Sequence, residues 1–95
     1  MIIGSIFQQP SDNLDYDIDC STLFSENPSD FLASVSATVE PAGLTIIAAV
    51  SDSKTGKLWV SGGVDCTEYL IEITFTSDAG RIKQDEIEVT IEEID

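Results

Sequence analysis

Residues 67–91, TEYLIEITFTSDAGRIKQDEIEVTI, contain two runs in which every second residue is apolar. A period of two is typical of a strand that buries one face. Asp78–Gly80 separates the runs and has the composition of a tight turn, in which the glycine can adopt a positive φ. A loop of this length places Tyr69 opposite Val89, with carboxylates on the other face. The stretch therefore predicts a β-hairpin that lies on a core.

Five further stretches also have the character of short strands separated by turn residues: Ile2–Phe7, Leu14–Cys20, Phe31–Val39, Leu44–Val50 and Lys57–Ser61. The stretch 44–50 is an almost unbroken apolar run, which predicts a central strand covered on both faces. The strand 57–61 could pair beside it or cross to a second sheet, and the pattern allows both. Six to seven short strands predict an all-β fold, an antiparallel β-sandwich. We expect a single domain, residues 1–95, in which residues 1–10 form an N-terminal strand or arm.

The composition excludes several classes of function. The chain has 95 residues, 42% of them hydrophobic, with 18 acidic residues against four basic ones and a formal net charge of -14. So acidic a surface repels phosphate backbones and argues against nucleic acid as a partner. The sequence contains no histidine, which excludes Ser-His and Cys-His catalysis. We therefore expect a protein that is not an enzyme, with no catalytic residue and no cofactor.

The start of the chain, Met1–Gly4, carries neither a basic segment nor a long apolar run. It predicts neither a signal peptide nor a transmembrane helix, and thus synthesis in the cytoplasm without a membrane partner. Cys20 and Cys66 are far apart in the sequence and could bridge only if their strands are neighbours. Reduced thiols are the expectation for a chain made in the cytoplasm.

Carboxylates are numerous, and two of their arrangements can be compared with known sites, a calcium-binding loop and a catalytic pair. Four acidic residues fit positions 1, 3, 5 and 12 of a calcium-binding loop: Asp15, Asp17, Asp19 and Glu26. The template requires glycine at position 6 and helices on both sides, whereas this chain has Cys20 there and strand-like flanks. The predicted hairpin also sets Glu72 opposite Glu86, on a solvated face that is unlike a catalytic cleft. We expect no metal site, although the pattern leaves open a weak surface cation site along the row Asp15, Asp17 and Asp19.

Seven residues are candidates for a protein interface: Trp59, Lys57, Arg81, Lys83, Asp15, Asp17 and Asp19. Trp59 is the only tryptophan, and it is a core residue unless Leu58 and Val60 face the core instead. In that second case Trp59 is an exposed aromatic anchor for a partner. The strands 2–7 and 57–61 are expected at sheet edges, where a neighbour can add a strand. The acidic rows favour a basic partner over self-association.

Several short segments occur together in this chain: Leu14–Asp19, Ser34–Ser36, Gly43–Thr45, Trp59–Gly63, Tyr69 and Ala79–Arg81. In combination they resemble a family of small tailed-bacteriophage virion proteins, the fibre–tail adaptors and minor head–tail components. The resemblance covers most of the chain after Pro10. It implies an immunoglobulin-like sandwich, and Tyr69, near the start of its strand, resembles the tyrosine corner of such domains.

The resemblance also implies a function. It points to a non-enzymatic structural protein of the virion, an adaptor or connector in the neck or tail that joins other subunits and is present in several copies. The implied partners are portal or neck, tail, fibre or major capsid subunits. One alternative is a capsid decoration protein. Another is an adhesive or carbohydrate-binding immunoglobulin-like module, which would need an exposed cluster of aromatic side chains.

Overall fold

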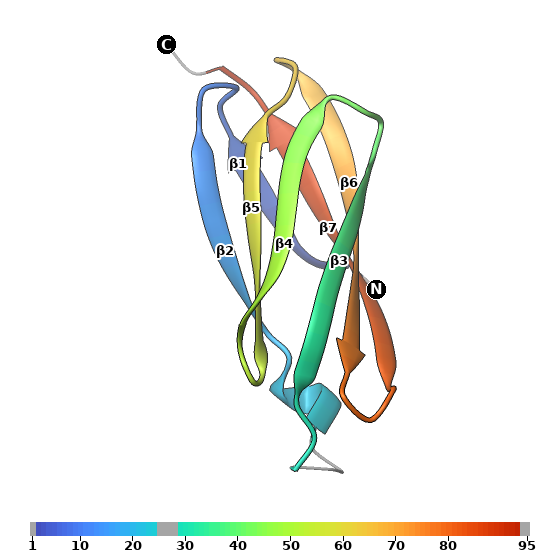
Figure 1. Cartoon of the computed structure of the whole chain (residues 1–95). Coiled ribbons are helices and arrows are strands. Elements are labelled where there is room, and N and C mark those ends of the chain that lie inside the picture. The colour runs from blue at the N-terminus through green and yellow to red at the C-terminus, as the bar shows by residue number, and fades with distance from the viewer. Residues whose placement is uncertain (1, 25–28, 94–95) are drawn as a thin grey trace.

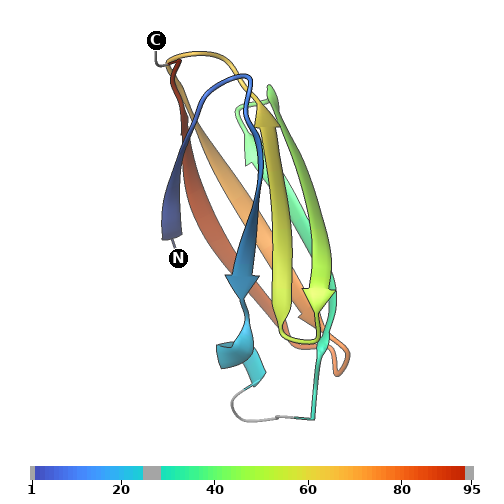
Figure 2. The ribbon, with the colours of Figure 1, turned by 90° about the vertical axis from the view of Figure 1, so that its left-hand side faces the viewer.

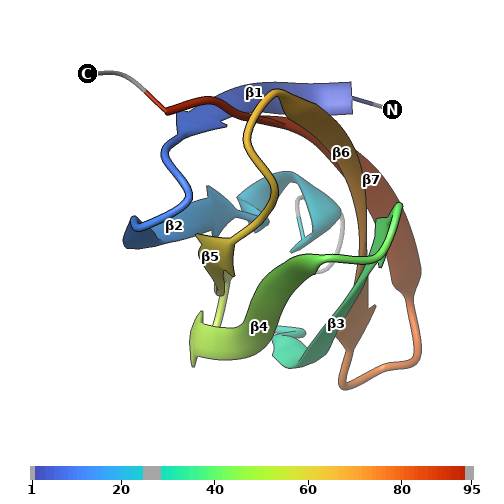
Figure 3. The ribbon, with the colours of Figure 1, turned by 90° about the horizontal axis from the view of Figure 1, so that it is seen from above.

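The computed structural model describes residues 2–24 and 29–93, and this part of the chain is built from strands (Figure 1). The elements are β1 (Ile2–Gln8), β2 (Asn13–Asp19), the single 3₁₀ turn η1 (Ser21–Phe24), β3 (Leu32–Glu40), β4 (Leu44–Asp52), β5 (Thr55–Gly62), β6 (Thr67–Ser77) and β7 (Ile82–Ile91). One sheet has the order β1-β7-β6-β3 and the other β2-β5-β4. Seen end-on, the two sheets form two layers around the core (Figure 3). The predicted all-β, immunoglobulin-like sandwich is confirmed.

The hairpin of β6 and β7 has the predicted register. Tyr69 lies opposite Val89, and Glu72 lies opposite Glu86. The loop is closed by Ser77, whose N–H donates to the carbonyl of Arg81 at 2.8 Å. Gly80 has a φ of 93°, a conformation that glycine adopts without steric cost. The three-residue loop and the period of two therefore fix the same pairing.

The pairing of β1 with β7 differs from the expected antiparallel arrangement, since these two strands run parallel. They come from the two ends of the described chain, so no local turn sets their relative direction. A parallel pair needs a long crossover, and here the crossover is the rest of the sandwich. β1 is an edge strand, as predicted.

Two predictions about β4 and β5 are wrong. The apolar run 44–50 does not form a central strand covered on both faces, because β4 is an edge strand and Ile47 is 59% exposed. Conversely, the strand 57–61 is not at an edge, because β5 pairs with both β4 and β2. The open question of its pairing is thereby answered. An apolar run predicts a strand but does not say whether that strand will be central or at an edge, or whether both of its faces will be covered.

The core lies between the two sheets and is filled by alternate residues of the strands. Its fully buried large side chains are Phe24, Phe75, Leu58, Ile71, Ile73, Ile91, Val60 and Val89. Tyr69 is 3% exposed, and its hydroxyl accepts a hydrogen bond from the N–H of Val64 at 3.0 Å. This is the geometry of a tyrosine corner, which ties the β5–β6 connection to the start of β6.

A buried aspartate ties the β6–β7 turn to the segment before β3. One oxygen of Asp30, Oδ1, accepts hydrogen bonds from the N–H of Phe31 at 2.9 Å and of Ala79 at 3.0 Å. The side chain is 6% exposed. Hydrogen bonds, first that of the Ser77 side chain, hold the pKa of Asp30 below its ordinary value of 3.8. Ionised Asp30 therefore stabilises the folded state.

This hydrogen bonding predicts a pH-dependent effect of Asp30→Asn. Because the pKa is lower in the folded than in the unfolded chain, the contribution of the charge is complete above the unfolded pKa. It is lost as the pH falls through the folded pKa. We expect the variant to be less stable than wild type at neutral pH and to approach wild type in strong acid. Urea denaturation across this pH range measures the difference. Asp78→Asn, at an exposed position of the same turn, is the control. A difference that persists unchanged in acid would contradict the prediction.

Candidate functional site

The structure brings five of the seven predicted interface residues together. Asp15, Asp17 and Asp19 of β2 and Lys57 and Trp59 of β5 share the outer face of the β2-β5-β4 sheet. In the register of these strands Asp15 lies beside Trp59 and Asp17 beside Lys57. We call this surface, together with Ile47, the Trp59 face. It covers all three strands of the sheet.

Trp59 takes the exposed orientation. Its neighbours Leu58 and Val60 are 1% and 0% exposed and point into the core, so Trp59 points outward and is 38% exposed. Ile47 of β4 is its cross-strand neighbour. The two side chains line a shallow hollow of about 380 Å³ whose other walls are Asn13, Thr45 and Ser61. A large aromatic beside an exposed aliphatic residue, with a polar rim, is typical of the centre of a protein interface.

Lys57 already forms ion pairs with two aspartates of β2. Its Nζ lies 2.9 Å from Asp15 Oδ2 and 3.5 Å from Asp17 Oδ1. The hydrogen bond to Asp15 is the main cause that raises the pKa of Lys57, and the same bond lowers the pKa of Asp15. One ammonium thus pairs with two carboxylates, and Asp19 adds a third acidic side chain to the same face of β2. The surface formed by these residues is therefore negative.

The structure does not bring Arg81 and Lys83 to the Trp59 face. Arg81 lies in the β6–β7 turn, where its backbone N–H donates to Ser77 Oγ at 3.0 Å. Lys83 belongs to β7, in the other sheet, on the same side of the strand as Asp85 and Ile87. Its Nζ lies 3.9 Å from Asp85 Oδ2. Charge reversal at Lys83 would thus place two carboxylates together, so this residue is an unsuitable probe of an interface.

The acidic row does not assemble a cation site in the part of the chain that the structure describes. There, no group of three or more cysteine and carboxylate side chains is close enough to hold a metal ion. Glu26, the last position of the calcium-loop template, lies outside the described residues. Asp19 instead caps the following turn, since its Oδ1 accepts a hydrogen bond from the N–H of Ser21 at 2.9 Å.

Both cysteines are free thiols, in agreement with the expectation from the sequence. Cys20 is buried and Cys66 is exposed. Burial raises the pKa of Cys20, whereas a hydrogen bond to Asp65 is the main cause that raises the pKa of Cys66. A raised pKa keeps a thiol protonated and poorly nucleophilic, so neither has the character of a reactive cysteine.

The sequence did not predict the positions of two residues, Ile47 and Asp85. Ile47 was expected in the core because its strand is apolar throughout. Asp85 was not assigned to either face of its strand. It lies on the same side of β7 as Ile87 and Val89 and is 5% exposed. This alternation is a signal in the sequence that places a carboxylate on the core side of a strand.

Three solved structures with a similar fold belong to three different proteins. The titin M3 domain is similar with a TM-score of 0.57 at 11% identity, covering 97% of this chain and 92% of that one. The PKD domain from the KIAA 1837 protein gives 0.50 at 13% identity, covering 98% and 82%. A 2,6-sialyltransferase of Photobacterium sp. JT-ISH-224 gives 0.51 at 13% identity, covering 96% of this chain and 18% of that one. At these identities the likeness shows the fold alone.

The two sheets and the tyrosine corner define an immunoglobulin-like β-sandwich. A family model described as podophage GP4 fiber-tail adaptor protein gp77 matches residues 8–90. The chain belongs to this family. No curated protein matches it significantly. Among the described residues, no helix has the length and apolar character needed to cross a membrane.

Proposed function

We propose that this protein is a non-enzymatic adaptor that joins fibre and tail subunits in the neck or tail of a tailed-phage virion. The family match over residues 8–90 is the observation that carries the proposal. The protein is made in the host cytoplasm and is then incorporated, in several copies, into the particle. Its partners are other virion proteins.

The geometry supports this function in two ways. The Trp59 face offers an aromatic and an aliphatic anchor, Trp59 and Ile47, on the three-stranded sheet. The outer face of the four-stranded sheet carries Glu72, Glu86 and Glu88 near one another on β6 and β7. Since both outer faces are acidic, two copies repel each other through them. Such surfaces favour assembly with basic partners over self-aggregation.

The test is the composition and form of particles assembled without this protein. We expect tails that form normally but lack fibres, and we expect fibres to return when the protein is supplied. Cryo-electron microscopy of wild-type particles should place it at the fibre–tail junction with the symmetry of the tail. Particles that keep their fibres without the protein would overturn the adaptor function.

The same experiment decides the alternatives. A capsid decoration protein would appear on the shell in icosahedral copy number. An adhesive or carbohydrate-binding module would lie at the distal end of a fibre. The exposed aromatics of the described chain do not support that reading, because Phe7, Phe31 and Trp59 lie on β1, before β3 and on β5, not in one cluster.

A further inference from the structure

The sandwich is open on the side where β1 and β2, the edge strands of the two sheets, face each other (Figure 2). The opposite side is closed because β3 and β4 pack against each other. Between β1 and β2 lies a cavity of about 440 Å³, which we call the β1–β2 groove. This volume falls within the range of roughly 300–1,000 Å³ that is usual for ligand pockets. The walls are mostly apolar: Ile3, Ile6, Ile18, Leu23, Phe75 and Ile87.

The groove exists in part because an inward position of β1 has no side chain. Gly4 pairs with Ile87, whose side chain is buried, and a Cβ added at Gly4 would have no heavy atom within 4 Å. Farther along β1, Gln8 links the two sheets. Its Nε2 donates to the carbonyl of Val60 at 3.1 Å, and its Oε1 accepts from the Tyr16 hydroxyl at 2.6 Å. The sheets are therefore held together beyond the groove and separated along it.

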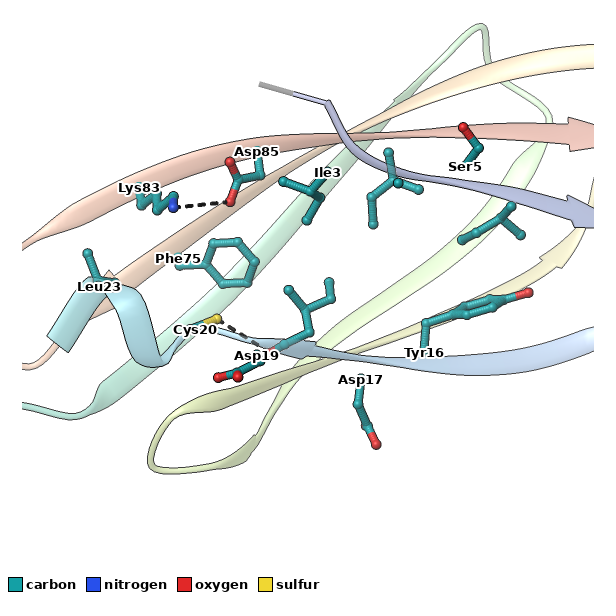
Figure 4. A pocket seen from close by; sticks show the side chains of 14 residues that line it. Ile3, Ser5, Tyr16, Asp17, Asp19, Cys20, Leu23, Phe75, Lys83 and Asp85 are labelled. Carbon is teal, nitrogen blue, oxygen red and sulfur yellow. Dashed lines mark hydrogen bonds and ion pairs between the residues drawn. The ribbon is translucent and has the colours of Figure 1, made fainter. Parts of the chain in front are cut away.

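A buried carboxylate lines the groove. Asp85 lies on the inward side of β7, before the point where β1 begins to pair, and it is 5% exposed (Figure 4). Its Oδ1 is buried and has no hydrogen-bond partner among the described residues. Its Oδ2 lies 3.9 Å from Nζ of the partly exposed Lys83, a long contact. One oxygen of a buried carboxylate is thus unsatisfied.

This arrangement is unfavourable for the isolated protein. A buried carboxylate oxygen that lacks a hydrogen bond destabilises the folded state, and a leucine at this position would avoid that cost. An unsatisfied buried polar group needs an explanation, and at the wall of an apolar groove a ligand or partner that supplies the missing contact is one. The second such atom, Oδ2 of Asp30, lies at the β6–β7 turn and does not line this groove. Among the described residues, Lys83 is the cation that pairs with Asp85, and it approaches Oδ2 and leaves Oδ1 without a partner. Lys57 is bound by Asp15 and Asp17 on the outer face. A donor that enters the groove from another protein would supply the contact that Oδ1 lacks.

We propose that the β1–β2 groove binds an extended segment of a partner protein, with apolar side chains and one arginine or lysine that pairs with Asp85. The apolar walls take the apolar side chains, and the edge strands β1 and β2 offer backbone hydrogen bonds to a strand lying between them. Asp17 and Asp19 belong to the strand that borders the groove, although the side chain of Asp17 points away from it (Figure 4). Their negative charge favours the approach of a basic segment over that of an acidic one. The biological setting of this site rests on the proposed adaptor function, in which the segment belongs to a neighbouring virion subunit.

A pair of synthetic peptides tests the proposal. Each has seven residues, the length of β1 and of β2, and alternates valine with threonine. The central residue is arginine in one peptide and citrulline, its neutral isostere, in the other. Titration of the isotope-labelled protein by NMR gives both dissociation constants. We expect the arginine peptide to bind wild type about tenfold more tightly, since only the arginine adds a charge-assisted hydrogen bond to Asp85.

Three variants locate the effect. Asp85→Asn should abolish the preference for arginine and should melt at or above the wild-type temperature, since it removes a buried charge. Gly4→Leu should fill the groove and weaken both peptides strongly. Glu88→Gln removes the same charge from the outer face of β7 and should keep the tenfold preference. If Asp85→Asn does not fold, Gly4→Leu still tests the site with Asp85 in place.

Equal affinity of the two peptides for wild type would overturn the proposal. So would an arginine preference that survives in Asp85→Asn, or Gly4→Leu binding as tightly as wild type. These outcomes are independent of the adaptor function. Particles that keep their fibres without the protein would overturn the adaptor function but not a positive peptide result. Particles that lose their fibres, together with a negative peptide result, would overturn only the proposed binding in the groove.

Discussion

Trp59→Ala should reduce incorporation of the protein into particles to background while the free domain remains folded. The side chain lies at the centre of the Trp59 face, and truncation of an interface tryptophan commonly costs 2 kcal/mol or more, about thirtyfold in affinity. In the free protein the change should cost only about 1–2 kcal/mol, because Trp59 is partly exposed and loses mainly its cross-strand contact with Ile47. Quantitative blotting of purified particles and a melting curve of the free domain measure the two effects.

Leu70→Ala is the matched control for Trp59→Ala. Leu70 is 37% exposed, against 38% for Trp59, but it lies on the outer face of the other sheet. This variant should melt slightly below wild type and be incorporated normally. Normal incorporation of Trp59→Ala would remove the Trp59 face from the interface. Loss of both variants from particles, with a lowered melting temperature for each, would show that incorporation follows stability. Loss of Leu70→Ala without such a change would show that a partner covers the outer face of the four-stranded sheet as well.

Gly63→Ala should be among the most destabilising single substitutions in the chain. Gly63 has a φ of 97°, and a Cβ there would lie 2.7 Å from Ile91 Cγ1 and 3.2 Å from Leu44 Cδ1. Both neighbours are buried, so they cannot move aside freely. Backbone strain and overpacking each cost about 1–3 kcal/mol, a large part of the 5–15 kcal/mol that stabilises a typical domain. Urea denaturation should show a much lower midpoint.

The adjacent glycine separates the two causes. Gly62 also has a positive φ, 76°, but a Cβ there would meet no atom within 4 Å. Gly62→Ala should therefore show only the backbone cost, and the difference between the variants measures the steric clash with Ile91 and Leu44. Equal destabilisation by both substitutions would show that the packing around Gly63 relaxes without cost.

The parts of the fold that follow from local rules could be predicted from the sequence. The β6–β7 register is fixed by a three-residue loop and by strict alternation, so Tyr69 opposite Val89 needs no knowledge of the other strands. The row Asp15, Asp17 and Asp19 was expected outside the core for the same reason, and it is exposed.

The parts that depend on tertiary partners could not be predicted. Whether β4 is central or at an edge depends on how many strands join its sheet, so the apolar run around Ile47 gives no answer. The orientation of Trp59 was open because its neighbours, Leu58 and Val60, are apolar too, and either face of β5 could have been buried. The parallel pairing of β1 with β7 joins segments from opposite ends of the chain. Such a contact has no signature in a local pattern.

The parallel pairing of β1 and β7 has a mechanical consequence. Because the strands run in the same direction, a pull that enters at Ile2 and leaves at Ile91 draws them past each other along their length (Figure 2). Their hydrogen bonds run across that pull and are loaded together. In a hairpin pulled from its open end, by contrast, the bonds break one after another. The described chain is 47 Å long and 20 × 17 Å across, so such a load would run along its longest dimension. A domain whose terminal strands are sheared in this way resists tension better than one whose terminal strands form a hairpin that opens from its end.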